Sequence, residues 1–575
     1  MRANPNQGNP DLISLIQRVP RRYLRALSAV GLGLALLAHG CASRSELKPV
    51  PAVATRKPQV TATNGMVASA HILASRAGLE MLKAGGNAID AAVAAAFAVG
   101  VVEPNDSGIG GEGVILIYRA DTKQTVAIDY RSAAPATASF TSKIPAGGHA
   151  GVAVPGTVAG LSLALQKYGT MKLPQVMAPA IKFAAEGFVI SATLAGEIAD
   201  NFDAIQKNEA LSAIMCPQGL PLEAGATLKT PDLARSLQKI AVGGPDAFYR
   251  GELAEAISAD MAANGGFMSK SDLAAYHAIA RTPVKGTYRG FELVSAPPPV
   301  AGATVIEILQ ILDQFDLAKG PPLSPENVHL MIEAIKRGFV DCSAFVADPD
   351  FVKVPLDGLL SPAYARTRAA EIHPGQLTAK VSAGEPVGEG SGNTTSLCAV
   401  DRQGNMAVLT QTISDHFGAK VVVPGTGILL NNEMKNFSAK GINAIAPGKR
   451  MRGTLAPTIL LKDGKPYAAL GTPGAGRIVS TTAILISNLI DHKLPIQEAI
   501  ESPRFYARDT EPKVSVEARL PSQTLEALKQ MGYSFQVMNE FDLFFGGAQG
   551  IVVDRKHHTL IGGADPRRDG VAVGF

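Results

Sequence analysis

The chain has 575 residues, of which 46% are hydrophobic, and its 54 Lys and Arg against 50 Asp and Glu give a net charge of +4. This composition is typical of a globular protein built of helices and strands, and it excludes an intrinsically disordered chain. The small net charge and the lack of a basic stripe argue against a nucleic acid as a partner. Four Cys are too few for a disulfide scaffold.

Residues 1–42 have the pattern of an export signal. Four arginines between positions 18 and 25 precede an apolar run at 26–38, which is too short to span a bilayer. The pair Arg21–Arg22 would suit a twin-arginine signal, and the sequence ending at Cys41 resembles a bacterial lipoprotein cleavage box, with Cys41 as the lipidated residue. We therefore expect a periplasmic protein, anchored to a membrane if Cys41 is lipidated, with residues 43–64 as a polar linker.

Two helices are expected near the start of the globular part. Residues 71–84 have apolar side chains at helical spacing, and Asn87 caps a nearly all-apolar helix at 88–102. The run 108–113 matches the dinucleotide-binding pattern GxGxxG. However, a helix precedes it and a strand follows it, whereas such a site needs a strand first and a helix after. The sequence therefore predicts a buried core helix and no nucleotide site.

The middle of the chain, at residues 150–375, alternates helical patterns with Gly and Pro. We interpret this part as a mainly helical scaffold. The chain has neither an HExxH pattern nor a CxxC pair, so we expect no metal site, and no cofactor is implied.

The junction of Asn393 and Thr394 is the main candidate for chemistry. A polar run at 376–392 ends here, and an expected hairpin follows around a Gly-containing turn at 401–405. If the chain is cleaved between these two residues, Thr394 gains a free α-amine, with an ordinary pKa of about 7.7–8.0, beside its own hydroxyl. That amine can accept the hydroxyl proton and make Thr394 a nucleophile. Without cleavage, the segment is only the entrance to a strand.

Two other segments offer groups that can hold negative charge. Arg131 ends an expected strand and is either a surface charge or a clamp for a carboxylate. The loop 471–477 lies between an expected strand and an expected helix. It misses the P-loop pattern because Arg477 and Ile478 replace the Lys and the hydroxyl residue. Its backbone amides could instead form an oxyanion hole.

With these segments in this order, the chain resembles the γ-glutamyltransferases, also called glutathione hydrolases, which are N-terminal nucleophile hydrolases. The resemblance runs from about residue 65 to residue 575. The segments that carry it are 65–69, 85–92, 129–131, 155–160, 348–351, 393–395, 428–438, 451–458 and 471–478. It implies an α+β fold of four αββα layers with a largely helical large-subunit scaffold. It also implies self-cleavage into a large subunit, 65–393, and a small subunit, 394–575, that remain together as a heterodimer.

The resemblance also assigns roles to individual residues. Thr394 is implied as the nucleophile, Thr412 as the hydroxyl that hydrogen-bonds it and assists self-cleavage, and the amides of Gly474 and Ala475 as the oxyanion hole. Ala475 stands where the family usually has a second Gly. Arg131 is implied to grip the α-carboxylate of the donor.

The substrate contacts depart from the family pattern. Where the family holds the α-amine with an Asn, a Glu or Gln, and an Asp, this chain has Ser414, Glu433 and Asn436. Where two Ser assist the arginine, it has Gly453 and Thr454. The loop between Phe437 and Lys449 is also shorter than in family members with a lid, which suggests an open cleft. The matched positions that we expect to bind substrate are Arg131, Ser414, Glu433, Asn436, Gly453 and Thr454.

Three functions follow from these observations. The first is a self-processing hydrolase or transferase that cleaves the γ-glutamyl bond of glutathione or related donors, with water, an amino acid or a peptide as acceptor. The second, motivated by Ser414 and Asn436, is a glutaryl or cephalosporin acylase on the same scaffold. The third is a periplasmic binding protein that never processes, against which the intact Thr394, Thr412 and Arg131 argue.

Overall fold

The computed structural model describes residues 57–140, 143–383, 393–508 and 510–575. The expected export signal, Cys41 and positions 43–56 of the expected linker lie outside this part of the chain. Within the described ranges, no helix is both long and apolar enough to cross a membrane.

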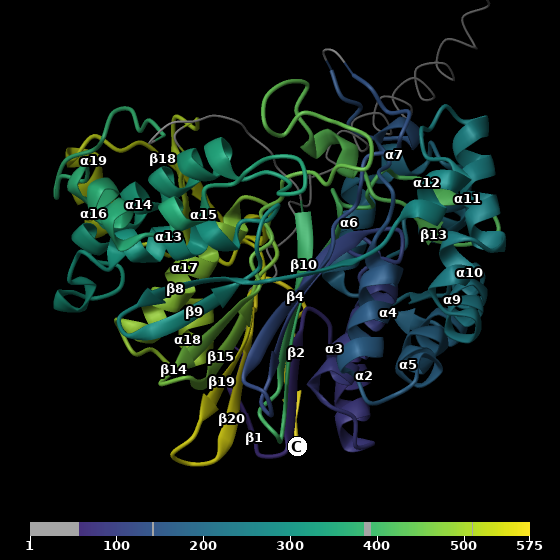
Figure 1. Cartoon of the computed structure of the whole chain (residues 1–575), viewed down its shortest axis with the longest axis horizontal. Helices are drawn as coiled ribbons and strands as arrows, with labels where there is room; N and C mark the ends of the chain where they lie inside the picture. Colours follow the sequence, from purple (N-terminus) through teal and green to yellow (C-terminus); the bar gives the residue numbers. More distant parts are fainter. Residues whose placement is uncertain (1–56, 141–142, 384–392, 509) are drawn as a thin grey trace, which may run out of the picture. The chain divides into compact units, whose positions relative to one another are not determined.

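Two antiparallel seven-stranded sheets form the centre of the described chain (Figure 1). In order across the first sheet, the strands are β1 (Val60–Ala62), β20 (Thr559–Ala564), β19 (Gln549–Asp554), β15 (Lys465–Gly471), β14 (Thr458–Lys462), β9 (Phe291–Ser295) and β8 (Val284–Tyr288). In the second sheet, they are β21 (Val571–Gly574), β2 (Gly65–Ser69), β10 (Asn393–Asp401), β11 (Met406–Ser414), β3 (Glu112–Arg119), β4 (Gln124–Tyr130) and β7 (Ile279–Arg281). Residues of β10 and β2 contact β19, β15 and β20, so the two sheets stack face to face.

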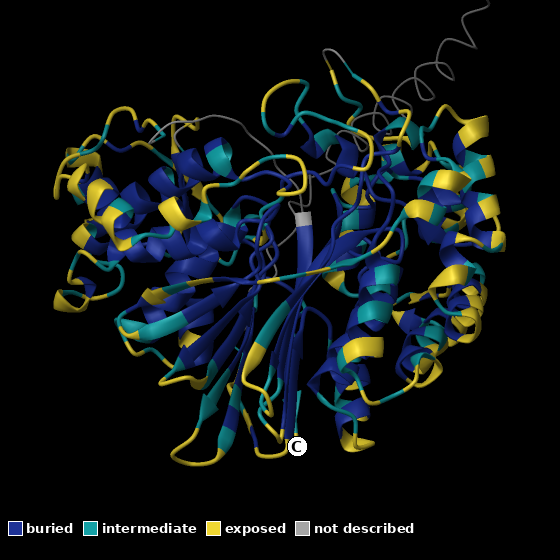
Figure 2. Ribbon diagram, in the orientation of Figure 1, coloured by how far each residue is buried: buried dark blue, intermediate teal, exposed yellow. Residues whose placement is uncertain are grey.

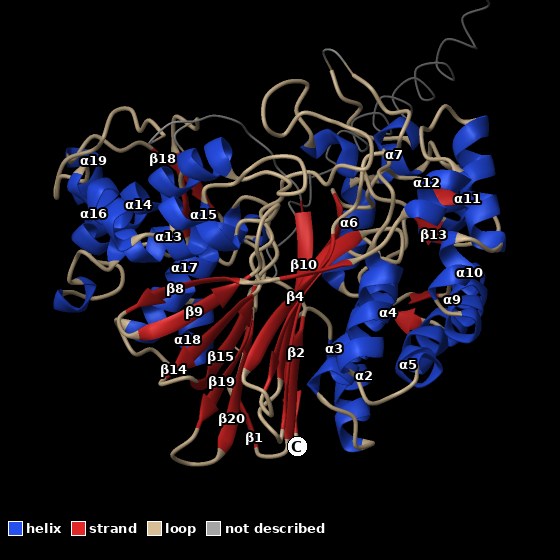
Figure 3. Ribbon diagram, viewed as in Figure 1, coloured by secondary structure: helices blue, strands red, loops and turns tan. Residues whose placement is uncertain are grey.

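Helices cover the outer face of each sheet (Figure 3). The first sheet packs against α13 (Gly302–Leu312), α17 (Arg477–Ile490) and α18 (Ile496–Glu501), with α14 (Pro325–Phe345) behind α13. The second sheet packs against α2 (Ile72–Lys83), α3 (Ala88–Val102) and α4 (Thr157–Tyr168), with α5 (Leu173–Glu186) behind α3. The predicted four-layer αββα arrangement is therefore confirmed.

Shorter and peripheral elements complete the fold. The remaining helices are α6 (Ala192–Asp200), α7 (Phe202–Ile205), α8 (Glu209–Met215), α9 (Pro231–Gly243), α10 (Pro245–Tyr249), α11 (Glu252–Ala263), α12 (Lys270–Ala275), α15 (Leu356–Leu359), α16 (Pro362–Ala370) and α19 (Ser522–Gln530). The remaining strands are β5 (Phe188–Val189), β6 (Thr227–Leu228), β12 (Val422–Val423), β13 (Ile428–Leu429), β16 (Phe505–Tyr506), β17 (Val514–Glu517) and β18 (Phe535–Met538). The predicted helical scaffold at 150–375 is present, with short strands among its helices.

The two helices predicted near the start of the globular part are present as α2 and α3. Asn87 caps α3, because its side-chain oxygen accepts hydrogen bonds from the amides of Ile89 and Asp90. In turn, the Asn87 amide donates to the Asp90 carboxylate. Nearly every residue of α3 is buried, because the helix lies between the second sheet and other helices (Figure 2). This explains why its sequence is apolar on all sides.

Each of the two sheets combines strands from before and after residue 394. In the second sheet, β10 and β11 lie between β2 and β3, and in the first, β14 lies beside β9. A break between Asn393 and Thr394 would therefore leave the two pieces joined by backbone hydrogen bonds on several edges.

Candidate active site

Thr394 lies at a register irregularity in the hairpin of β10 and β11. Asn393 pairs with Ser414 and Thr395 pairs with Gln411, so β11 has one more residue than β10 across this step. Such bulges re-aim side chains and are common beside active sites. Along the rest of β10, Cys398 and its even-numbered neighbours face the first sheet, and the odd-numbered residues face α3.

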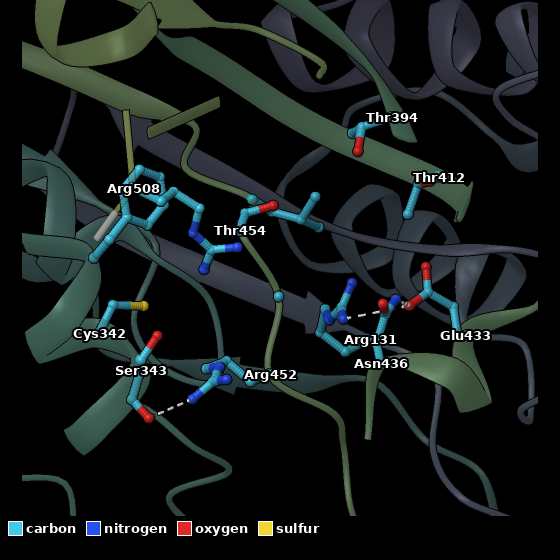
Figure 4. A pocket seen from close by; sticks show the side chains of 13 residues that line it. Arg131, Cys342, Ser343, Thr394, Thr412, Glu433, Asn436, Arg452, Thr454 and Arg508 are labelled. Atoms are coloured by element: carbon cyan, nitrogen blue, oxygen red, sulfur yellow. Dashed lines mark hydrogen bonds and ion pairs between the residues drawn. The ribbon is translucent and has the colours of Figure 1, made fainter. Parts of the chain in front are cut away.

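The hydroxyl of Thr394 opens into a pocket that also contains most of the predicted substrate contacts (Figure 4). The residues that line it are Arg131, Phe339, Cys342, Ser343, Thr394, Thr412, Glu433, Asn436, Arg452, Gly453, Thr454, Leu455 and Arg508. These come from both sides of the Asn393–Thr394 bond. The free volume of this pocket is about 30 Å³ with that bond intact.

Arg131 lies on the floor of this pocket among acidic groups. It follows β4, is 1% exposed, and its Nη1 pairs with Glu112. Its Nη2 lies 3.6 Å from Oε2 of Glu433 and donates to the carbonyl of Met451 at 3.4 Å. Burial lowers the pKa of the Arg131 guanidinium, and the Glu433 carboxylate opposes that effect. The arginine is therefore a buried member of an ion cluster and not a surface charge.

The three positions expected to hold an α-amine lie together beside Arg131. Asn436 donates through Nδ2 to Oε2 of Glu433 at 2.6 Å and to Oγ of Ser414 at 3.3 Å. Its own Oδ1 is buried and accepts no hydrogen bond from the described residues. Ser414 adopts φ 82°, a left-handed conformation, and its amide donates to Oγ1 of Thr412 at 2.8 Å. Glu433 and Asn436 thus supply oxygen acceptors to the pocket, whereas Ser414 contacts Asn436 and does not line the pocket itself.

The glycine loop begins against the strand of the nucleophile. A Cβ at Gly471 would lie 2.2 Å from Oγ of Ser396, two residues after Thr394, so only glycine fits there. The following turn holds Gly474 at φ 124° and Ala475 at φ 55°. Left-handed angles cost a residue with a Cβ about 1–2 kcal/mol, and such strain clusters at active sites. Neither of these two described residues lines the pocket in the uncleaved chain, so their oxyanion role stays a prediction.

Comparison with known proteins decides the family. The sequence model of the Gamma-glutamyltranspeptidase family matches residues 74–575. The chain belongs to the γ-glutamyltranspeptidase family. It is 38% identical over 573 residues to the glutathione hydrolase proenzyme of Escherichia coli, which covers 94% of this chain and 98% of that one. It is 40% identical over 550 residues to the acylase ACY 1 proenzyme of Pseudomonas sp. strain SE83, with 91% and 96% covered.

Solved structures agree with this assignment. The cephalosporin acylase of Bacillus halodurans superposes with a TM-score of 0.85 at 32% identity, covering 92% of this chain and 98% of that one. The γ-glutamyltranspeptidase of Helicobacter pylori gives a TM-score of 0.54 at 37% identity, covering 55% of this chain and 94% of that one. This family member is therefore an enzyme with the hydrolase and acyltransferase chemistry of its class.

Sequence reasoning missed the residue that holds Arg131. Glu112 begins β3, is fully buried, and accepts from the amide of Ser132 at 2.7 Å in addition to its pairing with Arg131. It lies in the glycine-rich run that matches a dinucleotide fingerprint. A charged residue among glycines at the start of a buried strand was an available signal, because buried carboxylates are rare unless they are paired.

Sequence reasoning also missed a second group of buried charges behind the nucleophile. Thr395 donates to Oε2 of Glu103 at 2.8 Å, and Arg568, which pairs with Asp106, donates to the carbonyl of Thr394 at 3.4 Å. Glu103, Asp106 and Arg568 line a separate cavity of about 220 Å³. Burial, and then the neighbouring Asp106, raise the pKa of Glu103 to about 8. These contacts fix the backbone of the residue that carries the nucleophile.

The raised pKa of Glu103 predicts a pH-dependent stability. Between its ordinary pKa of about 4.3 and its folded pKa of about 8, the folded state keeps a proton that the unfolded chain has lost. Stability should therefore fall as pH rises through this window. The Glu103→Gln variant mimics the protonated carboxyl. Its unfolding temperature should exceed that of the parent by a margin that grows from pH 5 to pH 9.

Thermal scans of an uncleavable parent, with Glu103→Gln and the exposed-site control Glu186→Gln, measure this margin. The control carboxylate is 69% exposed and should show no such trend. A margin for Glu103→Gln that stays constant across the pH range would contradict the assignment of this proton.

Proposed function

We propose that this enzyme is a self-cleaving γ-glutamyl hydrolase and transferase that acts on glutathione and related γ-glutamyl compounds through an acyl group on Thr394. The observation that carries the proposal is the shared pocket of Thr394, Arg131 and Glu433. A γ-glutamyl group brings an ammonium that Glu433 can pair with at one end and a scissile amide for Thr394 at the other.

The first step is cleavage of the chain itself. The hydroxyl of Thr394 adds to the carbonyl carbon of Asn393, the peptide C–N bond breaks, and the acyl group moves from nitrogen to Oγ1. Water then hydrolyses this ester, which gives Asn393 a free carboxylate and Thr394 a free amine. Thr412, which lines the same pocket, is the neighbouring hydroxyl that would assist.

Turnover then uses the new amine as base. It takes the proton from Oγ1 as that oxygen attacks the γ-carbonyl of the donor, and it passes the proton to the departing amine. The amides of Gly474 and Ala475 would stabilise the tetrahedral oxyanion, a contribution typically worth 10²–10³ in rate for one donor. Water resolves the acyl–enzyme in hydrolysis, and the amine of an amino acid or peptide resolves it in transfer.

The direct test is to follow purified protein on a denaturing gel while measuring its release of glutamate from glutathione. We expect two bands on the gel. N-terminal sequencing of the smaller band should show that this chain begins at Thr394. A small chain that begins elsewhere, or processed protein that leaves every γ-glutamyl compound intact, would refute it.

A second candidate function is a glutaryl or cephalosporin acylase. Ser414, Asn436 and Gly453 replace groups that the family uses for the glutamyl amine and carboxylate, and relatives named as acylases match nearly the whole chain. Comparing γ-glutamyl-anilide with glutaryl-anilide separates the two functions. A strong glutaryl preference would replace the first candidate by the second.

Restoring the family acid at position 436 should improve γ-glutamyl donors. Asn436 already lies 2.6 Å from Glu433 and beside Ser414, so Asn436→Asp would place a second carboxylate next to the donor ammonium. A charged acceptor is worth roughly 1 kcal/mol more than a neutral one, and we expect kcat/KM for γ-glutamyl-anilide to rise about fivefold. Glutaryl-anilide, which has no ammonium, is the control donor and should not gain. Equal gains on both donors would contradict this role for position 436.

We also propose that residues 1–42 direct export and that the enzyme works in the periplasm, with Cys41 as a candidate for lipidation. Activity released by osmotic shock would support a free periplasmic form. Activity that stays with membranes, and is released by Cys41→Ser, would support the lipid anchor. Activity confined to the cytoplasm would contradict the export proposal.

A further inference from the structure

We propose that Glu112 determines donor specificity by occupying Arg131, so that the pocket recognises the amine of the acyl donor more strongly than its α-carboxylate. The donor class that this favours is an ω-amino acyl group such as 4-aminobutyryl, which is γ-glutamyl without its α-carboxylate. The inference rests on the proposed function, because it concerns the acyl group that Thr394 receives.

The nitrogens of Arg131 are largely used before a donor arrives. Nη1 pairs with Glu112, and Nη2 donates to the Met451 carbonyl. Nη2 also faces the Glu433 carboxylate (Figure 4). Nε of this guanidinium is buried and has no hydrogen-bond partner among the described residues. A strong arginine–carboxylate contact needs two parallel N–H donors. A donor carboxylate could therefore form this contact only by displacing Glu112 or Glu433.

Glu112 itself is fixed and cannot easily move aside. Its other oxygen accepts from the amide of Ser132 at 2.7 Å, and its side chain is fully buried at the start of β3. Swinging it out of the ion pair would leave a buried carboxylate without a cation, which is strongly unfavourable. Separating Glu112 from Arg131 is thus costly in the folded site.

The position next to the guanidinium offers no hydroxyl for a carboxylate. A Cβ at Gly453 would lie 2.8 Å from Cζ of Arg131, so the guanidinium packs directly on the glycine backbone. Gly453 therefore permits the buried position of Arg131 and also removes a side-chain donor. Thr454 is the hydroxyl residue that remains on this side of the pocket.

The amine side of the pocket is, in contrast, ready for a cation. Glu433 and the unpartnered Oδ1 of Asn436 supply acceptors. Two carboxyl groups, those of Glu112 and Glu433, lie against the one guanidinium of Arg131. Arg452 and Arg508, the other cations of the pocket, lie apart from this cluster in Figure 4. An ammonium group therefore gains attraction here, whereas a carboxylate meets local repulsion.

Three anilide donors test the inference on the processed enzyme. γ-Glutamyl-anilide carries both charged groups, 4-aminobutyryl-anilide carries only the amine, and glutaryl-anilide carries only the carboxylate. We expect kcat/KM for 4-aminobutyryl-anilide to lie within tenfold of that for γ-glutamyl-anilide and at least tenfold above that for glutaryl-anilide. Faster turnover of the glutaryl donor than of the 4-aminobutyryl donor would overturn the inference.

The variant Glu112→Gln should release Arg131 for the donor carboxylate. The ratio of kcat/KM between γ-glutamyl-anilide and 4-aminobutyryl-anilide should rise tenfold or more, mainly through a lower KM for the γ-glutamyl donor. Glu112→Asp keeps the charge and should keep the ratio of the parent. Glu307→Gln, a buried glutamate of α13 that does not line the pocket, is the matched control and should also keep the ratio.

A purely structural role for Glu112 would lower turnover of all three donors together and leave their ratio unchanged, and that result would overturn the inference. If Glu112→Gln does not process, the donor series on the parent enzyme still decides the matter. The two proposals also fail differently. No turnover of any donor by processed enzyme refutes the proposed function, whereas γ-glutamyl turnover with the wrong donor order refutes only the role of Glu112.

Discussion

Replacing Thr394 by Ala should leave the chain as one full-length band on a denaturing gel and should reduce glutathione turnover by at least about 1,000-fold. The same side chain is assigned to two reactions, chain cleavage and donor attack, so its loss removes both. Alanine is smaller than threonine and fits the buried position without new contacts, since Thr394 is 2% exposed. The fold should therefore survive, and circular dichroism should match that of the parent.

Two other variants make this experiment specific. Thr394→Ser keeps a hydroxyl and should still cleave, though more slowly. Thr395→Val removes the neighbouring hydroxyl, which contacts Glu103 on the other side of the strand, and it should still yield two bands. Two bands from Thr394→Ala would show that another group cuts the chain, and unchanged turnover would remove Thr394 from the mechanism.

The fold was predictable from the sequence where local patterns and buried apolar runs agree. The residues around Asn87 combine a cap, a glycine stop and an all-apolar run, and they form the α2–α3 pair as expected. The β10–β11 hairpin followed from alternation and a Gly-containing turn. The order of strands in the sheets did not follow from such patterns, because it depends on pairings between distant segments such as β2 with β10.

The candidate site was predictable only in part. The resemblance pointed to Arg131, Glu433 and Asn436, and the structure places all three in the pocket of Thr394. Their charge state was not predictable, because the partner of Arg131 is nineteen positions earlier in the chain and becomes a neighbour only when β3 and β4 pair. In the sequence, Glu112 is one residue of a run that matches GxGxxG, and only tertiary packing shows that it is an ion-pair partner.

The cluster around Arg131 predicts the second large effect. In the uncleavable Thr394→Ala background, Arg131→Met should lower the free energy of unfolding by about 3–5 kcal/mol, because it leaves Glu112 and Glu433 buried without their cation. Removing Glu112 as well, in Arg131→Met/Glu112→Gln, should restore part of this loss, since fewer unpaired charges remain. Urea titrations of the three chains measure the differences as shifts of the unfolding midpoint.

A surface arginine provides the matched control for this charge deletion. Arg119 pairs with Asp121, and the two side chains are 39% and 61% exposed, so Arg119→Met should change stability by less than about 1 kcal/mol. The expected difference between the two variants comes from the burial of Arg131 and not from the loss of an arginine as such. Equal midpoint shifts for Arg131→Met and Arg119→Met would contradict this expectation. They would show that Glu112 and Glu433 become hydrated or protonated without a loss of stability when the arginine is removed. In that case Arg131 would not be the group that holds the negative charges of this pocket in place.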